Sequence, residues 1–521
     1  MLHPKFDEAS ISKPTAHLEP FTYSGFVYIT VTSKKTNNKR IELNTKNLKI
    51  LVNDVSVYRS ISLTNLDFDD DPDWNSKEIK YITVQRNKRD LSQMFSTGNT
   101  TTIDNVMENN GGEVMDDQPE MDVMKQPIEN GTIEHRKIDS DEINFKQYYY
   151  PILPPKDFVP IRVIDVENDE SNDKINIYLA TEMKKDIYYI VKVKFYGNMT
   201  HDKGFYYTYY DDIELNEENE EANDTISKPK YFAATFLEPF SGRRLFPCMD
   251  DHVFRTPFDI SISRTLHQTT ESASNLEDTE EIDDELVVDE YNTTASMKAS
   301  EVGITITNMN PHMYNINDNF SIIFYTRNKH FKNTKFASIE IPKIIDIFIE
   351  YTNQEFPHEV LKYVTVPNSD LTLSEIKNGM IISSEMHILL DKNYTTFSEN
   401  YVHVQLSSHL AQLWMYGYIN YKTREHYWLH DALAQYLQTI ALFKLNKTQQ
   451  AEHLILEDRL SAMRDELNYK STSLMYFNQY VDDPDYQNFI KRKGASILRM
   501  INSTISESVL SNAIQQYFGK M

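Results

Sequence analysis

The sequence predicts an α+β chain with strands in its first part and helices in its second part. Aromatic and β-branched residues with partial alternation recur between residues 21 and 263, and from about residue 335 the apolar residues recur at helical spacing. The chain has 521 residues, 40% of them hydrophobic, which is enough for two or three domains. Strands followed by helices, rather than alternating with them, are typical of α+β proteins.

The first domain is predicted at residues 1–264. Its strand segments are residues 21–32, 174–179, 188–196 and 258–263. Residues 86–147 lose this pattern, are polar and include a Gly-Gly pair, so we interpret them as a long disordered insertion. Residues 265–300 are acidic and rich in serine and threonine, and we interpret them as a linker or a second insertion.

The second domain is predicted at residues 301–521 and is mainly helical. Residues 337–352 place three isoleucines and Phe348 on one face of a helix. The same spacing predicts further helices at residues 398–416, 425–445, 447–466, 489–501 and 506–518.

The net charge of −25 argues against binding nucleic acid or an anionic membrane through bulk electrostatics. The one cysteine, Cys248, allows no intrachain disulfide and favours a reducing compartment, whereas several Asn-x-Ser/Thr sequons would be glycosylated only in the secretory route. The first residues show no apolar signal segment, and no apolar run approaches the roughly 20 residues of a transmembrane helix. The localisation and the oligomeric state stay open.

The most specific motif of the chain lies in residues 231–264. It reads Thr235-Phe236-Leu237-Glu238-Pro239 and then Phe246-Pro247-Cys248-Met249-Asp250-Asp251. This segment resembles the stretch of the M1 zinc aminopeptidases that runs Thr-Gln-x-Glu-Pro and later Phe-Pro-Cys-x-Asp-Glu-Pro. Residues 18–25, 204–206 and 493–500 resemble three further landmarks of that family.

The resemblance implies an N-terminal β-saddle domain of antiparallel strands followed by a thermolysin-like, mainly helical catalytic-type domain. It also implies that the family's later β-sandwich and helical-repeat domains are absent, with the chain ending inside or just after the catalytic domain. Members of the family hydrolyse the N-terminal peptide bond with a zinc-bound water. Their zinc is held by His-Glu-x-x-His on one helix and by a Glu on the next helix.

The zinc-ligand positions of the family fall on Ser408, Gln412 and Asp431, and the family's spacing of nineteen residues separates the last two. Hydroxyl and amide groups are poor zinc ligands, and one carboxylate does not hold zinc. We therefore expect no zinc cofactor and no metal site here. The general base falls on His409 and the transition-state Tyr on Lys491, and neither is expected to function without a metal.

Four further residues have two interpretations each. The family's amine-binding Glu falls on Glu238, and the Glu of its Gly-Ala-Met-Glu-Asn loop falls on Glu375 in one of two alignments. These two carboxylates either form an acidic pocket for a cationic amine or are retained for the fold. His426 and His430, at i and i+4, are either a chance pair or a metal site together with Asp431.

Three hypotheses about function follow. The first is a catalytically inactive homologue that keeps the scaffold for binding a peptide or a protein. The second is an active metalloaminopeptidase with an unusual site, which requires His409, His430 and Asp431 to converge. The third is a partial or decaying gene product without a selected activity.

Overall fold

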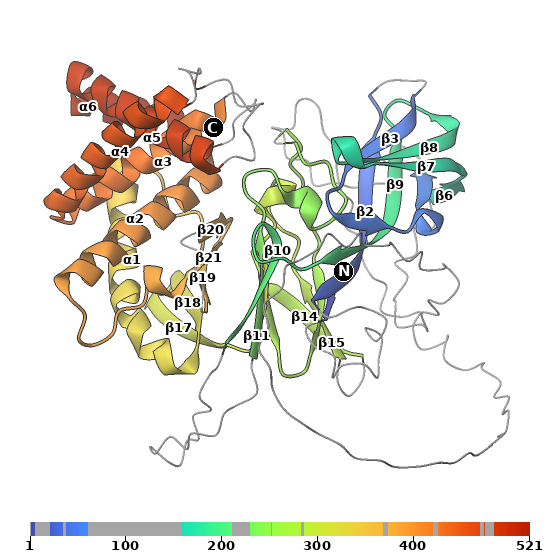
Figure 1. The fold of residues 1–521 in the computed structure, drawn as a ribbon, viewed down its shortest axis with the longest axis horizontal. Helices are drawn as coiled ribbons and strands as arrows, with labels where there is room; N and C mark the ends of the chain where they lie inside the picture. The colour runs from blue at the N-terminus through green and yellow to red at the C-terminus, as the bar shows by residue number, and fades with distance from the viewer. Residues whose placement is uncertain are drawn as a thin grey trace, which may run out of the picture. The chain divides into compact units, whose positions relative to one another are not determined.

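The first part of the chain folds into mainly antiparallel sheets, drawn in blue and green in Figure 1, in which β1 and β12 form a parallel pair. The computed structural model describes residues 2–5, 21–34, 38–60, 158–210, 230–251, 253–282, 286–367, 374–419, 426–468, 474 and 484–520. The predicted disordered insertion at residues 86–147 lies outside the described residues. The predicted α+β class is confirmed, because strands dominate the first part and helices the second.

The largest sheet has the order β14-β15-β12-β1-β2-β9-β5-β6, with β4 also paired to β9. Its strands are β1 (Leu2–Lys5), β2 (Thr22–Thr32), β4 (Leu48–Ile50), β5 (Ser56–Ser60), β6 (Phe158–Ile161), β9 (Tyr188–Asn198), β12 (Ser261–Thr265), β14 (Leu276–Glu281) and β15 (Leu286–Tyr291). A second sheet contains β3 (Asn38–Asn44), β8 (Lys174–Met183) and β7 (Val163–Asp169) in that order. The strands predicted from residues 21–32, 174–179 and 188–196 are β2, β8 and β9.

The third sheet joins strands that lie far apart in the sequence. Its order is β10 (Gly204–Tyr210), β11 (Lys230–Phe236), β16 (Ile304–Thr307) and β13 (Thr269–Ser272). Strand β11 leads directly into the segment that contains Glu238. The third sheet therefore fixes the position of one candidate site residue.

Residues 265–300, interpreted as an acidic linker or a second insertion, do not form an unstructured linker, because β13, β14 and β15 lie within them. The acidic residues are not all solvated. Asp289 on β15 is 2% exposed, and its Oδ1 accepts a hydrogen bond from Arg264 at 3.1 Å. Val287 and Val288 beside it are also buried. The many acidic residues of this segment suggested a solvated loop, whereas the Asp289 carboxylate of β15 is paired inside the protein.

The fourth sheet belongs to the second part of the chain and is mixed. Its order is β17 (Asn310–Asn317), β18 (Phe320–Thr326), β19 (Val360–Val366), β21 (Met380–Ser384) and β20 (Ser374–Lys377). Strand β19 is parallel to both β18 and β21, whereas the two outer pairs are antiparallel. The helical spacing after residue 335 did not predict these last three strands, which are short and separated from one another by turns.

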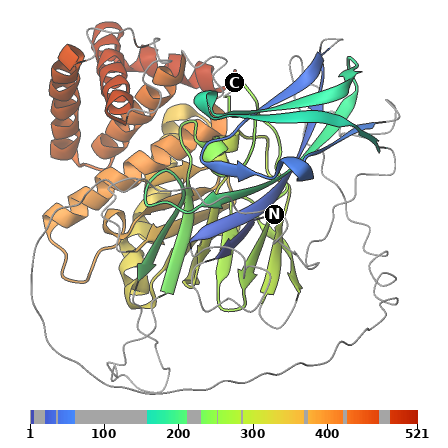
Figure 2. The ribbon, with the colours of Figure 1, turned by 45° about the vertical axis from the view of Figure 1, so that its right-hand side comes forward.

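Six helices are described in the second part: α1 (Lys335–Thr352), α2 (Thr396–Tyr418), α3 (Tyr427–Lys444), α4 (Thr448–Asn468), α5 (Pro484–Ile505) and α6 (Glu507–Phe518). Each corresponds to a helix predicted from the sequence. Buried residues of α1, α2 and α3 share one hydrophobic core with β18 and β19. Figure 2 shows the long helix α2 from the side.

Helices α3 and α5 approach each other closely. A Cβ atom at Gly494 would lie 2.6 Å from the Cβ of Ala432 and 3.1 Å from the Trp428 ring. Only glycine permits this separation without a shift of one helix. The contact brings Lys491, one turn before Gly494, toward the helix that carries Asp431.

Candidate functional site

The orientation of α2 determines which of its residues face the candidate site. Thr395 caps the helix, because its Oγ1 accepts a hydrogen bond from the Ser398 amide at 3.1 Å. Leu406, Leu410 and Leu413 are fully buried on the core side. The half-buried positions, 405, 408, 412 and 416, recur at helical spacing on another face.

Ser408 and Gln412 bond to each other on this half-buried face. The Gln412 Nε2 donates a hydrogen bond to the Ser408 Oγ at 3.1 Å. Their positions at i and i+4 place both side chains on one side of the helix, as the sequence predicted. A hydroxyl and an amide that satisfy each other offer no imidazole, thiolate or carboxylate to a metal, so these residues do not fit zinc.

His409, the next residue after Ser408, points about 100° further round the helix. Its imidazole is 1% exposed, and its Nδ1 hydrogen-bonds the Tyr363 hydroxyl on β19. Burial lowers the pKa of His409 well below its ordinary value, and the nearby charges of His387 and Lys491 lower it further. The imidazole is therefore neutral at neutral pH and is held by the core of the domain.

A small buried polar cluster around His409 was not predicted from the sequence. The ring of His387 lies 5.7 Å from that of His409, and its Nδ1 is 2.7 Å from the Ser383 Oγ. Burial lowers the pKa of His387 to about 4. Tyr363, Ser383 and His387 come from separate strands and a turn, so no local sequence pattern announces them.

Lys491 and Asp431 interact across the contact between α5 and α3. Burial lowers the pKa of the Lys491 ammonium, and the carboxylates of Asp431 and Asp458 oppose this effect. Asp431 also accepts a hydrogen bond from the His430 Nδ1 at 3.1 Å. A side-chain cation thus acts electrostatically on the carboxylate at the family's third ligand position and on His409.

His426 and His430 occupy different environments. His426 is exposed and precedes the first residue of α3, whereas His430 is 2% exposed and its ring lies 5.0 Å from that of Tyr416. Within the described residues, no group of three or more His, Cys, Asp or Glu side chains is arranged so that it could hold a metal ion.

Glu375 joins β20 to the end of β11. Its Oε1 accepts hydrogen bonds from the backbone amides of Leu237 and Glu238, both at 2.5 Å, and from the Lys377 Nζ at 3.0 Å. Lys377 is fully buried. These contacts commit one oxygen of the Glu375 carboxylate to the fold.

Glu238 carries a carboxyl group that its surroundings satisfy only in part. Its Oε1 accepts a hydrogen bond from the Ser300 Oγ at 3.1 Å, while its Oε2 is buried without a hydrogen-bond partner among the described residues. Burial raises the pKa of Glu238 to about 7, although Lys298 and Lys377 pull it down. The Glu238 carboxyl therefore keeps its proton to a higher pH than an ordinary glutamate does.

Glu238→Gln is expected to change how stability depends on pH. Because the folded state holds the Glu238 proton to about pH 7 and the unfolded state releases it near its ordinary pKa, the free energy of unfolding falls as pH rises between these values. The shift is worth about 3 kcal/mol. The free energy of unfolding is measured with urea at pH 5 and pH 8. Relative to the wild type, the stability of Glu238→Gln should be higher at pH 8 than at pH 5 by about that amount.

The exposed residue Glu277 supplies the control for this comparison. Glu277→Gln should follow the wild-type pH dependence. Parallel pH curves for Glu238→Gln and the wild type would show that the Glu238 carboxyl ionises normally.

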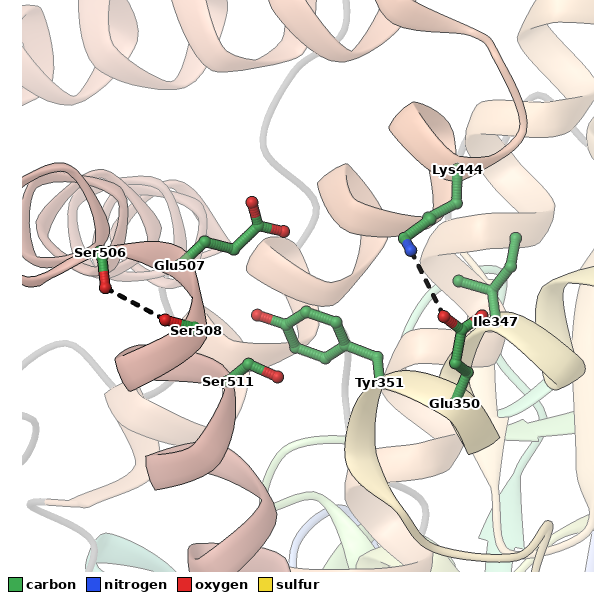
Figure 3. A pocket seen from close by; sticks show the side chains of 8 residues that line it. All are labelled: Ile347, Glu350, Tyr351, Lys444, Ser506, Glu507, Ser508 and Ser511. Atoms are coloured by element: carbon green, nitrogen blue, oxygen red, sulfur yellow. Dashed lines mark hydrogen bonds and ion pairs between the residues drawn. The ribbon is translucent and has the colours of Figure 1, made fainter.

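A cavity of about 510 Å³ lies elsewhere, between α1, α3 and α6 (Figure 3). It is lined by Ile347, Glu350, Tyr351, Lys444, Ser506, Glu507, Ser508 and Ser511. Lys444 and Glu350 form an ion pair of 3.5 Å at one side, and the Tyr351 ring lies between them and the start of α6. None of the family's site positions lines this cavity.

Two family models match consecutive parts of the chain. The model of the peptidase M1 N-terminal domain matches residues 130–300, and that of the peptidase family M1 domain matches residues 336–521. Endoplasmic reticulum aminopeptidase 2 of Bos taurus is 24% identical over 55% of this chain and 30% of its own length. Aminopeptidase A of Gloydius brevicauda is 23% identical over 65% of this chain and 35% of its own length.

An aminopeptidase-like protein of Caenorhabditis elegans is also similar, at 22% identity over 68% of this chain and 31% of its own length. These matches, together with a β domain followed by a helical domain, define an aminopeptidase homologue. The chain belongs to peptidase family M1.

The matched region spans about a third of the length of these relatives. Among the described helices, none has the length and apolar character needed to cross a membrane.

Proposed function

We propose that this chain is a catalytically inactive M1 aminopeptidase homologue that retains the scaffold for binding a peptide or a protein. The observation that carries the proposal is the hydrogen bond between Gln412 and Ser408. The two side chains at the family's ligand positions on α2 are hydrogen-bonded to each other. A zinc ion there would gain only a hydroxyl and an amide, which are weak ligands.

The other family positions support the same proposal. His409 at the general-base position bonds the Tyr363 hydroxyl in the core, and Lys491 at the tyrosine position supplies a positive charge that interacts with Asp431. Without a metal, the pKa of water near 15.7 leaves no nucleophile for a neutral imidazole to produce at neutral pH. These residues therefore do not supply an activated nucleophile for the hydrolysis of a peptide bond.

Glu238 supports retained binding, because its Oε2 has no hydrogen-bond partner in the described part of the chain. A buried acceptor of this kind is stabilised by a bound donor such as a peptide ammonium group. The alternative function is a residual metalloaminopeptidase activity that uses His409, His430 and Asp431. The names of the relatives favour this alternative, whereas the bond between His409 and Tyr363 does not.

Metal analysis and activity assays of the purified chain test the proposal. We expect far less than one zinc per chain and no chelator-sensitive hydrolysis of aminoacyl reporter substrates. The chain should also show a cooperative thermal transition. Peptides with a free N-terminus should bind more tightly than N-acetylated peptides, and Glu238→Gln should weaken that preference. One zinc per chain with chelator-sensitive turnover would establish the alternative, and a chain without a cooperative transition would favour the decaying gene product.

A further inference from the structure

Helix α4 carries an apolar stripe that faces solvent. Its exposed side chains are Leu456, Leu460, Met463 and Leu467, at 45%, 56%, 64% and 82% exposure. Ala451, Asp458 and Ala462 are buried on the opposite side of the same helix. The stripe therefore takes no part in the packing of α4 onto its own domain.

The spacing of the stripe is that of a coiled-coil seam. Its members are separated by four, three and four residues, which is the alternation of a and d positions in a heptad repeat. Leu456 and Met463 occupy d positions, and Leu460 and Leu467 occupy a positions. A solvated helix face needs no such regularity, and a run of leucines in this register packs into a matching helix.

Charged residues flank the seam on both sides. Glu457 and Arg464 follow the two d positions, and Arg459 and Glu466 precede the two a positions. The side chains of Glu457, Arg464 and Glu466 are 51%, 72% and 37% exposed, and Arg459 is also exposed. These are the e and g positions, whose charges decide which partner and which orientation a coiled coil accepts.

We propose that the seam on α4 binds the same seam of a second copy of this chain in antiparallel orientation. In that arrangement Leu456 packs against Leu467 of the second copy, and Leu460 packs against Met463 of the second copy. Each e position then faces the partner's e position and each g position the partner's g position. Glu457 faces Arg464, and Arg459 faces Glu466, so all four flanking charges meet an opposite charge.

The parallel orientation brings like charges together. There each g position faces the partner's next e position, which sets Glu452 beside Glu457 and Arg459 beside Arg464. Like charges at such distances destabilise an interface, as they do within a helix. The charge pattern therefore selects a second copy in the antiparallel orientation.

Contacts within the chain do not prevent this pairing. Arg464 pairs with its neighbour Asp465 at 3.2 Å, and Glu466 pairs with Lys493 at 2.8 Å. Both pairs lie at the surface, where an ion pair contributes about 0–1 kcal/mol. The acidic and basic groups remain able to take part in pairs across the seam.

Measuring the solution mass of the full chain over a range of concentrations tests the proposal. We expect the wild type to approach twice the monomer mass as concentration rises, and Leu460→Glu to remain a monomer. Met313→Glu is the matched control, because Met313 on β17 is 59% exposed and lies outside the seam. Thermal transitions of both variants should match the wild type, since neither side chain is buried.

Cysteine cross-linking tests the orientation. The native Cys248 is fully buried, so it gives no background reaction. Leu456→Cys and Leu467→Cys chains should form few disulfides separately under mild oxidation and should form them efficiently when mixed. A wild type that stays monomeric, an unchanged dimer in Leu460→Glu, or cross-linking of each cysteine variant with itself would overturn the proposal.

Discussion

A chain with Ser408→His, Gln412→His, Asp431→Glu and Lys491→Tyr is expected to bind one zinc ion far more tightly than we expect of the wild-type chain. The side chains at positions 408 and 412 already touch on one helix face, so two imidazoles placed there share a face as in His-x-x-x-His. Replacing Lys491 removes a cation that acts electrostatically on Asp431. Structural zinc sites bind with about 10–16 kcal/mol.

Metal content by mass spectrometry and the rise of the thermal transition on adding zinc would measure this gain. The matched control keeps Gln412 and carries the other three substitutions, so it lacks one of the three ligands. It should bind zinc far more weakly than the fourfold variant. A fourfold variant that folds and binds no zinc would mean that these three positions do not converge as the family's ligands do.

Arg499→Met is expected to destabilise the chain by about 3–5 kcal/mol. Arg499 on α5 donates to the Asp458 carboxylate on α4 at 2.8 Å and to the Thr439 hydroxyl on α3 at 2.7 Å. Asp458 is 1% exposed, and Gln435 is its other hydrogen-bond donor, at 3.1 Å. Without the guanidinium, the buried Asp458 carboxylate loses its ion-pair partner at 2.8 Å.

Chemical denaturation of Arg499→Met and the wild type measures this effect. Arg40→Met is the control, because Arg40 is 49% exposed and its ion pair with Glu42 should contribute less than about 1 kcal/mol. Adding Asp458→Asn to Arg499→Met should recover part of the loss, since burial already raises the pKa of Asp458. A loss below about 1 kcal/mol in Arg499→Met would show that the three helices do not depend on this cluster.

The helices were predictable because their apolar spacing is continuous. The segment 337–352 corresponds to α1, and the predicted end of the last helix at residue 518 matches the end of α6. Strands β19, β20 and β21 were missed because they are short and fully buried, which leaves no alternation to detect. The strands in residues 265–300 were missed because acidic residues at the surface outweighed the buried valines of β15.

The candidate site was predictable where it depends on spacing within one helix. The i, i+4 spacing of Ser408 and Gln412 predicts that they share one helix face, and the structure shows a hydrogen bond between them. The bond between His409 and Tyr363 joins residues 46 positions apart, so its prediction required the register of α2 against β19. The contacts of Glu375 were likewise not predictable from the sequence, because they depend on the position of β20 beside the end of β11.

One landmark of the family acquires a packing explanation. The segment 493–500 resembles the family's Lys-Gly-Ala-x-x-Leu-Arg-Met helix. Here Gly494 permits the close approach of α3 and α5, and Arg499 pairs with Asp458. Two residues of the motif therefore have packing roles in this chain.

Glu375 shows how a residue that the family resemblance suggested for binding can be held in place by the fold itself. Its carboxylate holds two backbone amides and a buried lysine, so most substitutions at this position would be removed by selection for folding alone. Among descendants of this chain, an invariant Glu375 would record the architecture of the joint between β11 and β20. Ser408 and Gln412 are only half-buried and bond to each other, so we expect substitutions at these two positions to affect folding less.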